Sequence, residues 1–285
     1  MNPIVLNIAD GTTFFVGLAL VLAAETILIR LGSRIARAIL TLLAITGIIL
    51  VVISATPLPI WMYLFWTIPA IAGLIPPDGT FPARKFRIIS NSVLLFATVA
   101  LCVAEAPHRR CPGLVVPKGT IIYVLGDSIS SGIGMEQRSW PDVLEGMIPF
   151  RVVSLAQPGS TVKSAILRAT DITVPRSLII VEIGGNDLLG KTDAATFRSD
   201  LENLVSALCS DHHQVLLLEL PLFPFRNAYG MAQRDIVAKY GIAMLPKRCF
   251  AQVLGTENGT LDGLHLSQAG HDEMARIIAG VIQQQ

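Results

Sequence analysis

Residues 120–130 read TIIYVLGDSIS, an apolar run that ends in a glycine and polar residues. The β-branched and large apolar side chains of residues 120–125 favour a strand that is buried on both faces. Gly126 and Asp127 then favour a turn, so Ser128 should lie just beyond the carboxyl end of the strand. Runs of similar composition follow at residues 151–155, 178–183, 215–220 and 242–245.

Helix-like segments separate these runs. They occupy residues 140–147, 162–169, 195–208 and 228–240, with a last one at 267–282. Strands that are apolar on both faces and alternate with helices indicate an α/β fold, with a five-stranded parallel sheet covered by helices on two sides. Residues 119–285 are expected to form this domain.

The first third of the chain has a different composition. Hydrophobic residues make up 52% of the chain and charged residues 15%, whereas soluble domains carry about 25% charged residues. Apolar runs near the length of a membrane span occupy residues 14–29, 38–55, 59–75 and 88–103. Residues 1–105 are therefore predicted to be an all-α transmembrane region of about four helices, followed by a linker at 106–118. A cleaved signal peptide with a buried helical domain is disfavoured, because no Lys or Arg precedes Phe14.

Basic residues between the apolar runs predict the membrane orientation. One cluster (Arg30, Arg34, Arg37) separates the first two runs, and another (Arg84, Lys85, Arg87) separates the last two. If both clusters are cytoplasmic, the protein is a multi-pass cell-membrane protein whose C-terminal domain is extracytoplasmic, in the periplasm. Arg109 and Arg110 oppose this orientation, and the domain would be cytoplasmic if residues 88–103 did not cross. Glu25 is expected to reach the headgroups or to pair with Arg30.

Charge and cysteine content exclude other classes. A net charge of +1 gives no basic field for nucleic acid. The four cysteines (Cys102, Cys111, Cys209, Cys249) show no metal-ligand spacing, so no metal site is predicted. Cys209 and Cys249 should flank opposite ends of neighbouring strands, roughly 20 Å apart, which predicts no disulfide between them.

The residues after the predicted strands predict acyl-transfer chemistry, because ligands bind beyond the carboxyl ends of parallel strands. A serine nucleophile needs a histidine base that a carboxylate orients, and Ser128, His265 and Asp262 can take these roles. An oxyanion hole needs hydrogen-bond donors. Asn186 offers its side-chain amide, and the backbone N–H groups of Ser128 and Gly159 are further candidates. Asp127 and Asp187 are expected to fix their turns through local hydrogen bonds.

Three segments resemble the SGNH (GDSL) hydrolases, most closely the bacterial thioesterase, lysophospholipase and arylesterase branch: VLGDSISSGIGMEQRSWPDVL at 124–144, VEIGGND at 181–187 and DGLHLSQAGH at 262–271. The resemblance covers about residues 120–282. It implies a flavodoxin-like three-layer sandwich, with Ser128 as nucleophile, Gly159 and Asn186 as oxyanion donors, His265 as base and Asp262 as its orienting acid. Ser154 and Pro158 depart from the family's pattern, and Pro158 lies directly beside Gly159.

The predicted function is hydrolysis of a carboxylic ester or thioester through an acyl-enzyme on Ser128, without metal or organic cofactor. The same site could instead act as an O-acyltransferase, and a catalytically inactive, membrane-tethered binding module is a third alternative. The substrate would be a small-molecule or lipid ester, and the lipid bilayer is the partner of the N-terminal helices. Apolar residues after the strands could line an acyl pocket or pack in the core: Met135, Leu188, Leu189, Leu222 and Phe223. The sequence leaves the acyl chain, the leaving group and the oligomeric state open.

Overall fold

The computed structural model describes residues 3–29, 34–75 and 83–284, which fall into two compact units. The sheet unit comprises Met1–Leu6, Arg110–Leu222 and Ala228–Gln285. The helical unit comprises Asn7–Arg109 and Phe223–Asn227.

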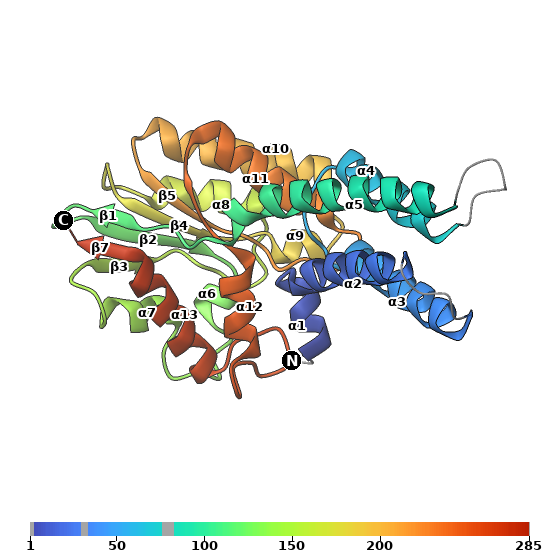
Figure 1. The fold of residues 1–285 in the computed structure, drawn as a ribbon. Helices are drawn as coiled ribbons and strands as arrows, with labels where there is room; N and C mark the ends of the chain where they lie inside the picture. Colours follow the sequence, from blue (N-terminus) through green and yellow to red (C-terminus); the bar gives the residue numbers. More distant parts are fainter. Residues whose placement is uncertain (1–2, 30–33, 76–82, 285) are drawn as a thin grey trace. The chain divides into compact units, whose positions relative to one another are not determined.

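A five-stranded parallel sheet forms the centre of the sheet unit (Figure 1). Its strands are β2 (Ile121–Gly126), β3 (Arg151–Ser154), β4 (Leu178–Glu182), β5 (Gln214–Leu218) and β6 (Ala243–Leu245). Their order is β3-β2-β4-β5-β6, and every neighbouring pair is parallel. This is the flavodoxin-like order. The predicted α/β fold with a five-stranded parallel sheet is confirmed.

Helices cover both faces of the sheet (Figure 1). One face carries α7 (Trp140–Glu145), α12 (Lys247–Gly255) and α13 (Gln268–Val281), and the other carries α8 (Val162–Arg168), α10 (Ala194–Ser210) and α11 (Asn227–Tyr240). Every residue of β4 is buried because side chains alternate between two covered faces. Two short helices, α6 (Ser128–Ser131) and α9 (Gly185–Leu189), follow β2 and β4 at the carboxyl edge, and η2 (Ala169–Asp171) follows α8.

The sheet unit also contains elements that the sequence analysis left unassigned. β1 (Leu114–Val116) pairs in parallel with β7 (Ile282–Gln284) and lies within the segment predicted to be a linker. Leu114 and Val116 are buried on either side of an exposed Val115, a pattern too short to distinguish from coil. α12 was also missed, although its residues separate into an apolar and a polar face.

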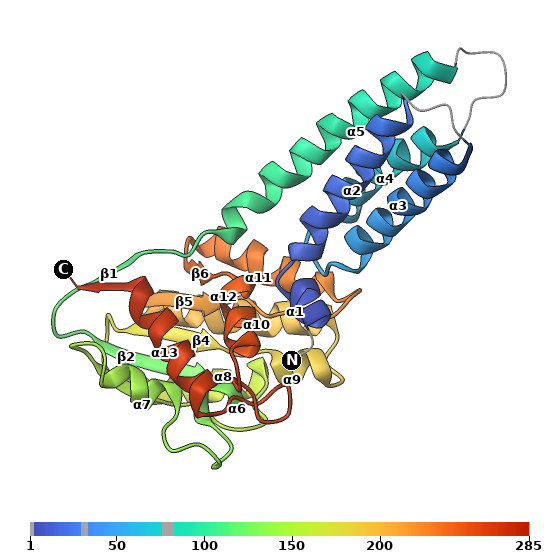
Figure 2. The same ribbon diagram turned by 60° about the horizontal axis from the view of Figure 1, so that its bottom comes forward.

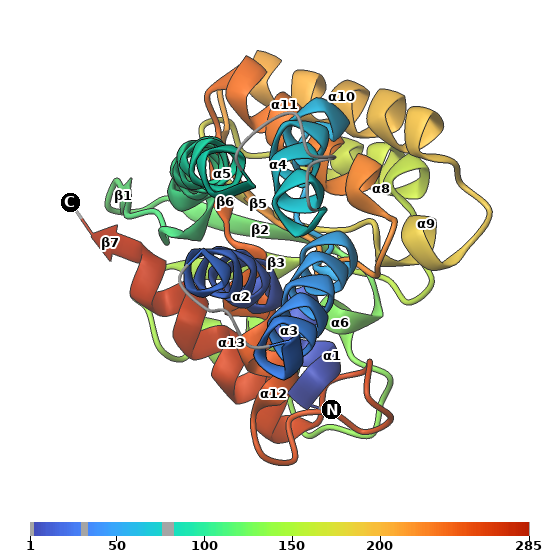
Figure 3. The same cartoon turned by 45° about the vertical axis from the view of Figure 1, so that its right-hand side comes forward.

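The helical unit consists of α2 (Thr12–Leu28), α3 (Arg34–Ile53), α4 (Ile60–Leu74) and α5 (Ala83–Glu105), with η1 (Ala106–Arg109) after α5. α1 (Pro3–Ala9) extends from one unit into the other along the chain. α2 to α5 run side by side (Figure 2), as an end-on view also shows (Figure 3). By length and composition, Arg34–Ile53 and Arg84–Arg109 could each cross a membrane, whereas α2 and α4 are shorter.

Small residues allow α2 and α3 to pack closely. A Cβ atom on Gly17 would lie 2.5 Å from the Gly47 carbonyl oxygen, and one on Gly47 would lie 2.8 Å from the Gly17 carbonyl oxygen. Such backbone approach is typical of packed membrane helices.

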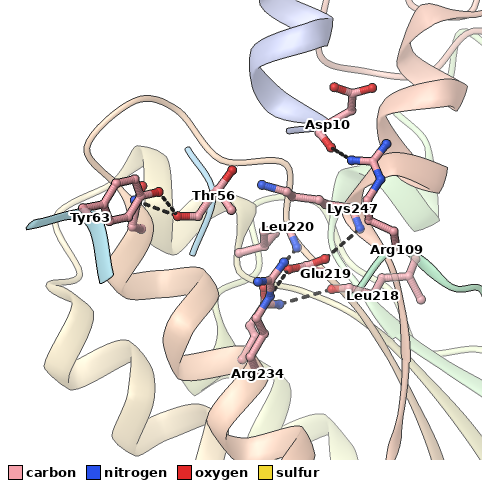
Figure 4. Close-up of polar contacts among 11 residues, drawn as sticks. Asp10, Thr56, Tyr63, Arg109, Leu218, Glu219, Leu220, Arg234 and Lys247 are labelled. Atoms are coloured by element: carbon pink, nitrogen blue, oxygen red, sulfur yellow. Dashed lines mark hydrogen bonds and ion pairs between the residues drawn. The ribbon is translucent and has the colours of Figure 1, made fainter. Parts of the chain in front are cut away.

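A polar contact also lies within the helical unit. The Tyr63 hydroxyl donates to the Thr56 carbonyl at 2.6 Å, and the Asn227 amide donates to the same hydroxyl (Figure 4).

Glu25 lies inside the helical unit, contrary to the expectation that it would reach the headgroups. Its side chain is 3% exposed and packs against Gly73 of α4. The expectation failed because it considered α2 alone, without a neighbouring helix to cover this position. Arg30, its expected partner, lies outside the described residues.

Candidate active site

Ser128 stands at the sharp turn from β2 into α6. Asp127 caps this helix, because its Oδ1 accepts from the Ile129 N–H at 2.9 Å. The turn requires a glycine at position 126, since a Cβ atom there would lie 2.4 Å from Ser130 Oγ. Ser128 itself is only half-buried. The local sequence therefore places a serine hydroxyl at the accessible carboxyl edge of the sheet.

Asp262 and His265 form a hydrogen-bonded pair in the loop that precedes α13. Asp262 Oδ1 accepts from the backbone N–H of Leu264 at 2.9 Å and of His265 at 2.8 Å, and its Oδ2 lies 2.7 Å from His265 Nδ1. Gly263, with φ of 90°, provides the turn between them. The hydrogen bond from His265 holds the pKa of Asp262 at about 2, with both backbone bonds contributing. The carboxylate is thus ionised at neutral pH and leaves Nε2 of His265 available.

The loop with Asp262 and His265 leads into α13, whose start is hydrogen-bonded to the segment after α6. Gln268 Oε1 accepts from the backbone N–H of Gln137 at 2.9 Å and of Arg138 at 3.0 Å. The Trp140 N–H donates to His271 Nδ1 at 3.0 Å. These bonds join the segment after α6 to the start of α13. Within the described residues, no hydrogen bond links Ser128 to His265, and such bonds are often long or absent in active sites without substrate.

The Asn186 amide connects three loops at the same edge of the sheet. Its Nδ2 donates to the Ser160 carbonyl at 2.9 Å and to Asp127 Oδ2 at 3.2 Å. Gly159 precedes Ser160 and is exposed, with φ of 75°. The structure therefore brings Asn186, Gly159 and the Ser128 turn together. Both hydrogens of the Asn186 amide are therefore in hydrogen bonds. To donate to an oxyanion, the amide would have to give up one of them, and the bond to Asp127 is the longer of the two.

Asp187 differs from the local role expected of it. Its Oδ2 accepts from the Val162 N–H at 2.9 Å, 25 residues away in the sequence. The carboxylate therefore joins the turn after β4 to the first residue of α8. The sequence could not show this contact, because it depends on the order of the strands. For Asp127, the expected local bond to Ile129 is confirmed.

A buried glutamate lies beneath the Ser128 turn and was missed by the sequence analysis. Glu182, the last residue of β4, accepts from Ser130 Oγ at 2.7 Å, and Trp140 Nε1 donates to the same Oγ at 3.2 Å. Burial raises the pKa of Glu182 well above its usual range, and the charge of Asp127 adds to this effect. Burial also raises the pKa of Asp127 to about 6, against the lowering effect of the Ile129 bond and the charge of His265. A protonated Glu182 hydrogen-bonded to an ionised Asp127 is consistent with the direction of both pKa shifts. The sequence offered one indication of this residue, a carboxylate within the otherwise apolar run at residues 178–183.

The residues suggested for an acyl pocket separate by burial. Leu188 is 5% exposed and Leu222 is 1% exposed, so both belong to the core and do not line an open pocket. Met135 and Leu189 are exposed. Phe223 is exposed and belongs to the helical unit.

Across residues 3–29, 34–75 and 83–284, no group of three or more His, Cys, Asp or Glu side chains is arranged to hold a metal ion.

Comparison with known proteins identifies the family. The model of the GDSL-like Lipase/Acylhydrolase family matches residues 124–273. Esterase TesA of Pseudomonas aeruginosa is 24% identical over 168 residues, covering 54% of this chain and 83% of TesA. A crystal structure of TesA aligns with a TM-score of 0.52 at 23% identity, covering 57% of this chain and 97% of that one. The psychrotrophic esterase EstA from Pseudoalteromonas sp. aligns with a TM-score of 0.50 at 19% identity, covering 56% and 97%. These likenesses show the fold. Because the family model matches more than half of its length, the chain belongs to the GDSL-like lipase/acylhydrolase family and is a hydrolase of ester bonds.

Proposed function

We propose that the chain is a membrane-anchored serine esterase with Ser128 as nucleophile, His265 as general base and Asp262 as the residue that orients His265. The observation that carries this assignment is the 2.7 Å contact between His265 Nδ1 and Asp262 Oδ2, in the loop that leads into α13. The start of α13 is hydrogen-bonded to the segment that follows α6, the helix that begins at Ser128. An ionised carboxylate on Nδ1 fixes the tautomer in which Nε2 can accept the serine proton.

The proposed reaction proceeds through an acyl-enzyme. Ser128 Oγ attacks the carbonyl carbon of the ester while its proton passes to His265 Nε2. The backbone N–H groups of Ser128 and Gly159 and the Asn186 amide stabilise the oxyanion. Collapse expels the alcohol or thiol, which takes the proton from His265. Water, activated by the same histidine, then hydrolyses the acyl-enzyme and restores Ser128.

The composition of the helical unit supports membrane anchoring. Large apolar side chains on its outer surface are 65–75% exposed: Ile35, Leu42, Ile60, Ile68, Phe96 and Val103. Polar groups instead pair inside, since Trp66 Nε1 donates to Thr98 Oγ1 at 2.9 Å and Ser90 Oγ donates to the Pro69 carbonyl at 2.8 Å. Large apolar residues outside and hydrogen-bonded polar pairs such as these inside suit a lipid environment. We assign residues 1–105 to the membrane region and 119–285 to the esterase domain.

Sidedness follows from the basic residues. The described members of the two clusters are Arg34 and Arg37 in α3, and Arg84, Lys85 and Arg87 in α5. With both clusters cytoplasmic and four crossings, the esterase domain is extracytoplasmic. An enzyme tethered there meets lipid and cell-envelope esters, which we propose as its substrate class. The name Esterase TesA of the Pseudomonas aeruginosa relative supports hydrolysis over acyl transfer to another alcohol.

Labelling of the nucleophile tests the proposal. A fluorophosphonate probe should label the detergent-solubilised full-length chain, and Ser128→Ala should abolish both labelling and hydrolysis of p-nitrophenyl esters of graded chain length. Ser131→Ala is the matched control in the same helix, because the Ser131 hydroxyl donates only to the adjacent Gly132 carbonyl, at 3.0 Å. Labelling that persists in Ser128→Ala would remove Ser128 from the nucleophile role.

A further inference from the structure

Two cysteines far apart in the sequence meet within the sheet unit. Cys111 Sγ lies 2.8 Å from Cys249 Sγ, and the two residues are 138 positions apart. This separation is within about 0.8 Å of the roughly 2.05 Å bond between disulfide sulfurs. Both thiols are free in the structure. We propose that Cys111 and Cys249 form a disulfide bond in an oxidising environment.

Buried contacts fix the backbone that carries Cys249. This residue lies in the first turn of α12, where its N–H donates to the Pro246 carbonyl at 2.9 Å. The start of α12 is held by Glu219, whose Oε2 accepts from the Lys247 N–H at 2.9 Å (Figure 4). Glu219 Oε1 accepts from Arg234 Nε at 2.8 Å, and both side chains are buried. Cys249 therefore has a defined position without any disulfide.

Cys111 lies three residues before the small sheet formed by β1 and β7. It precedes β1, in which Leu114 is buried and pairs with Ile282 of β7. β7 directly continues α13, and α13 packs against α12. Both cysteines are thus attached to one framework of packed elements. Packed elements adjoining both cysteines therefore support the proximity of the two sulfurs.

The accessibility of the two thiols sets the order of the chemistry. Cys111 is exposed, whereas Cys249 is 5% exposed. The Cys111 thiolate attacks one sulfur of an oxidant disulfide, a small molecule or an oxidoreductase, and releases the first thiol. The Cys249 thiolate then attacks the Cys111 sulfur of this mixed disulfide and releases the second thiol. Two cysteine thiols are oxidised, the oxidant disulfide is reduced to two thiols, and the cysteine protons pass to these leaving groups.

Burial should slow the second step. It raises the pKa of the Cys249 thiol to about 12, and the neighbouring Cys111 adds to the shift. Cys111, in contrast, is exposed, and Arg248 Nη2 lies 3.8 Å from its Sγ. We therefore expect rapid mixed-disulfide formation at Cys111, followed by slower closure that accelerates as the pH rises.

The bond would stabilise the framework without touching the reacting atoms. α12 ends at Gly255, and the loop with Asp262 and His265 follows it. A disulfide that closes a long loop stabilises the folded state mainly by constraining the unfolded chain. The expected effect is a higher melting temperature with kcat unchanged.

Glutathione redox buffers test the bond on the detergent-solubilised full-length chain. After equilibration, the protein is acid-quenched, denatured and alkylated with a maleimide polymer. The reduced chain should gain an adduct on each of its four cysteines, and the oxidised chain only on Cys102 and Cys209. Non-reducing peptide mass spectrometry should identify the Cys111–Cys249 pair. Four adducts at every redox ratio, or Cys249 joined to another cysteine, would overturn the proposal.

Two single variants provide the controls. Cys111→Ser removes an exposed thiol, so it should fold, remain active and lose the oxidised species. Cys209→Ser keeps the pair and should behave as the parent. Oxidation should raise the melting temperature of the parent and of Cys209→Ser by roughly 5–15 °C, and leave that of Cys111→Ser unchanged. An equal rise in Cys111→Ser would also refute the proposal, because the stabilisation would then not come from this bond.

Discussion

Ser130 donates its hydroxyl hydrogen to the buried carboxyl of Glu182 at 2.7 Å, directly beneath the turn that presents Ser128. Glu182 also shares a hydrogen bond with Asp127, which in turn accepts from Asn186. We predict that Glu182→Gln keeps kcat/KM within about threefold, because an amide can both accept from Ser130 and donate to Asp127. Glu182→Leu should lower kcat/KM at least tenfold and the free energy of unfolding by about 1–3 kcal/mol, since Ser130 loses its buried acceptor.

The pH dependence of unfolding isolates the charge of Glu182. Its pKa in the folded state is raised by burial, so the unfolded chain loses this proton at a lower pH than the folded protein. The native protein therefore loses stability, relative to Glu182→Gln, as the pH rises from the ordinary glutamate pKa of 4.5 toward the raised folded-state pKa, by up to ~1.4 kcal/mol per pH unit. Urea unfolding of both proteins measures this difference. Parallel stability curves would show that Glu182 is already ionised in the folded state.

Asn186→Ala should lower kcat by roughly 100- to 1000-fold with a smaller change in KM, because an oxyanion donor binds the transition state more tightly than the ground state. Steady-state kinetics with p-nitrophenyl esters measures both constants. Asp187→Asn is the neighbouring control: its side-chain oxygen can still accept from the Val162 N–H, so kcat should stay within about threefold. A raised KM with unchanged kcat in Asn186→Ala would make Asn186 a substrate-binding residue.

Asp262→Asn should lower kcat/KM by about 10²- to 10⁴-fold, because the amide no longer fixes the required tautomer of His265. The folded-state pKa of Asp262 is lowered to about 2. Its ionised form therefore contributes stability above its ordinary pKa of about 3.8, which is lost as the pH falls toward 2. Between pH 4 and 9 this carboxylate stays ionised and should add no step to the pH–rate profile. An acid limb in that range that disappears in Asp262→Asn would contradict the assignment.

Two glycines test the geometry of the Ser128 turn. Gly126→Ala should lower the free energy of unfolding by about 1–3 kcal/mol, because its Cβ atom would lie 2.4 Å from Ser130 Oγ. Gly280→Ala in α13 meets no atom within 4 Å. It should stabilise the protein by up to about 1 kcal/mol through helix propensity. Urea unfolding of the two variants should give shifts of opposite sign, and equal shifts would show that the turn can relax.

The five strands of the central sheet could be predicted from the sequence, whereas β1, β7 and α12 of the same unit could not. The five predicted strands agree with β2 to β6 within one or two residues at either end, because parallel strands buried on both faces have an unmistakable composition. Short polar motifs after β2 and β4, and one in the loop before α13, led to the prediction of Ser128, Asn186 and His265 as site residues.

Contacts between distant segments could not be predicted in this way. The bond from Val162 to Asp187 and the proximity of Cys111 to Cys249 both depend on which elements pack together. Pairing of β1 with β7 depends likewise on the chain returning to a three-residue segment. Glu25 shows the same limit, because its burial comes from α4 and not from its own helix.

A reporter fused after Gln285 tests the proposed orientation. If α2 to α5 all cross and both basic clusters are cytoplasmic, alkaline phosphatase at this site should be active and green fluorescent protein dark. Fusions after residue 57, in the loop between α3 and α4, should give the same pattern, and fusions after residue 79 the reverse. The redox state of Cys111 and Cys249, trapped in intact cells by alkylation, gives a second readout, because the pair should be oxidised only outside the cytoplasm. A fluorescent green fluorescent protein fusion at Gln285 together with reduced cysteines would place the esterase domain in the cytoplasm. This result would refute the four-span topology. The proposed disulfide would still be tested by oxidation of the purified chain.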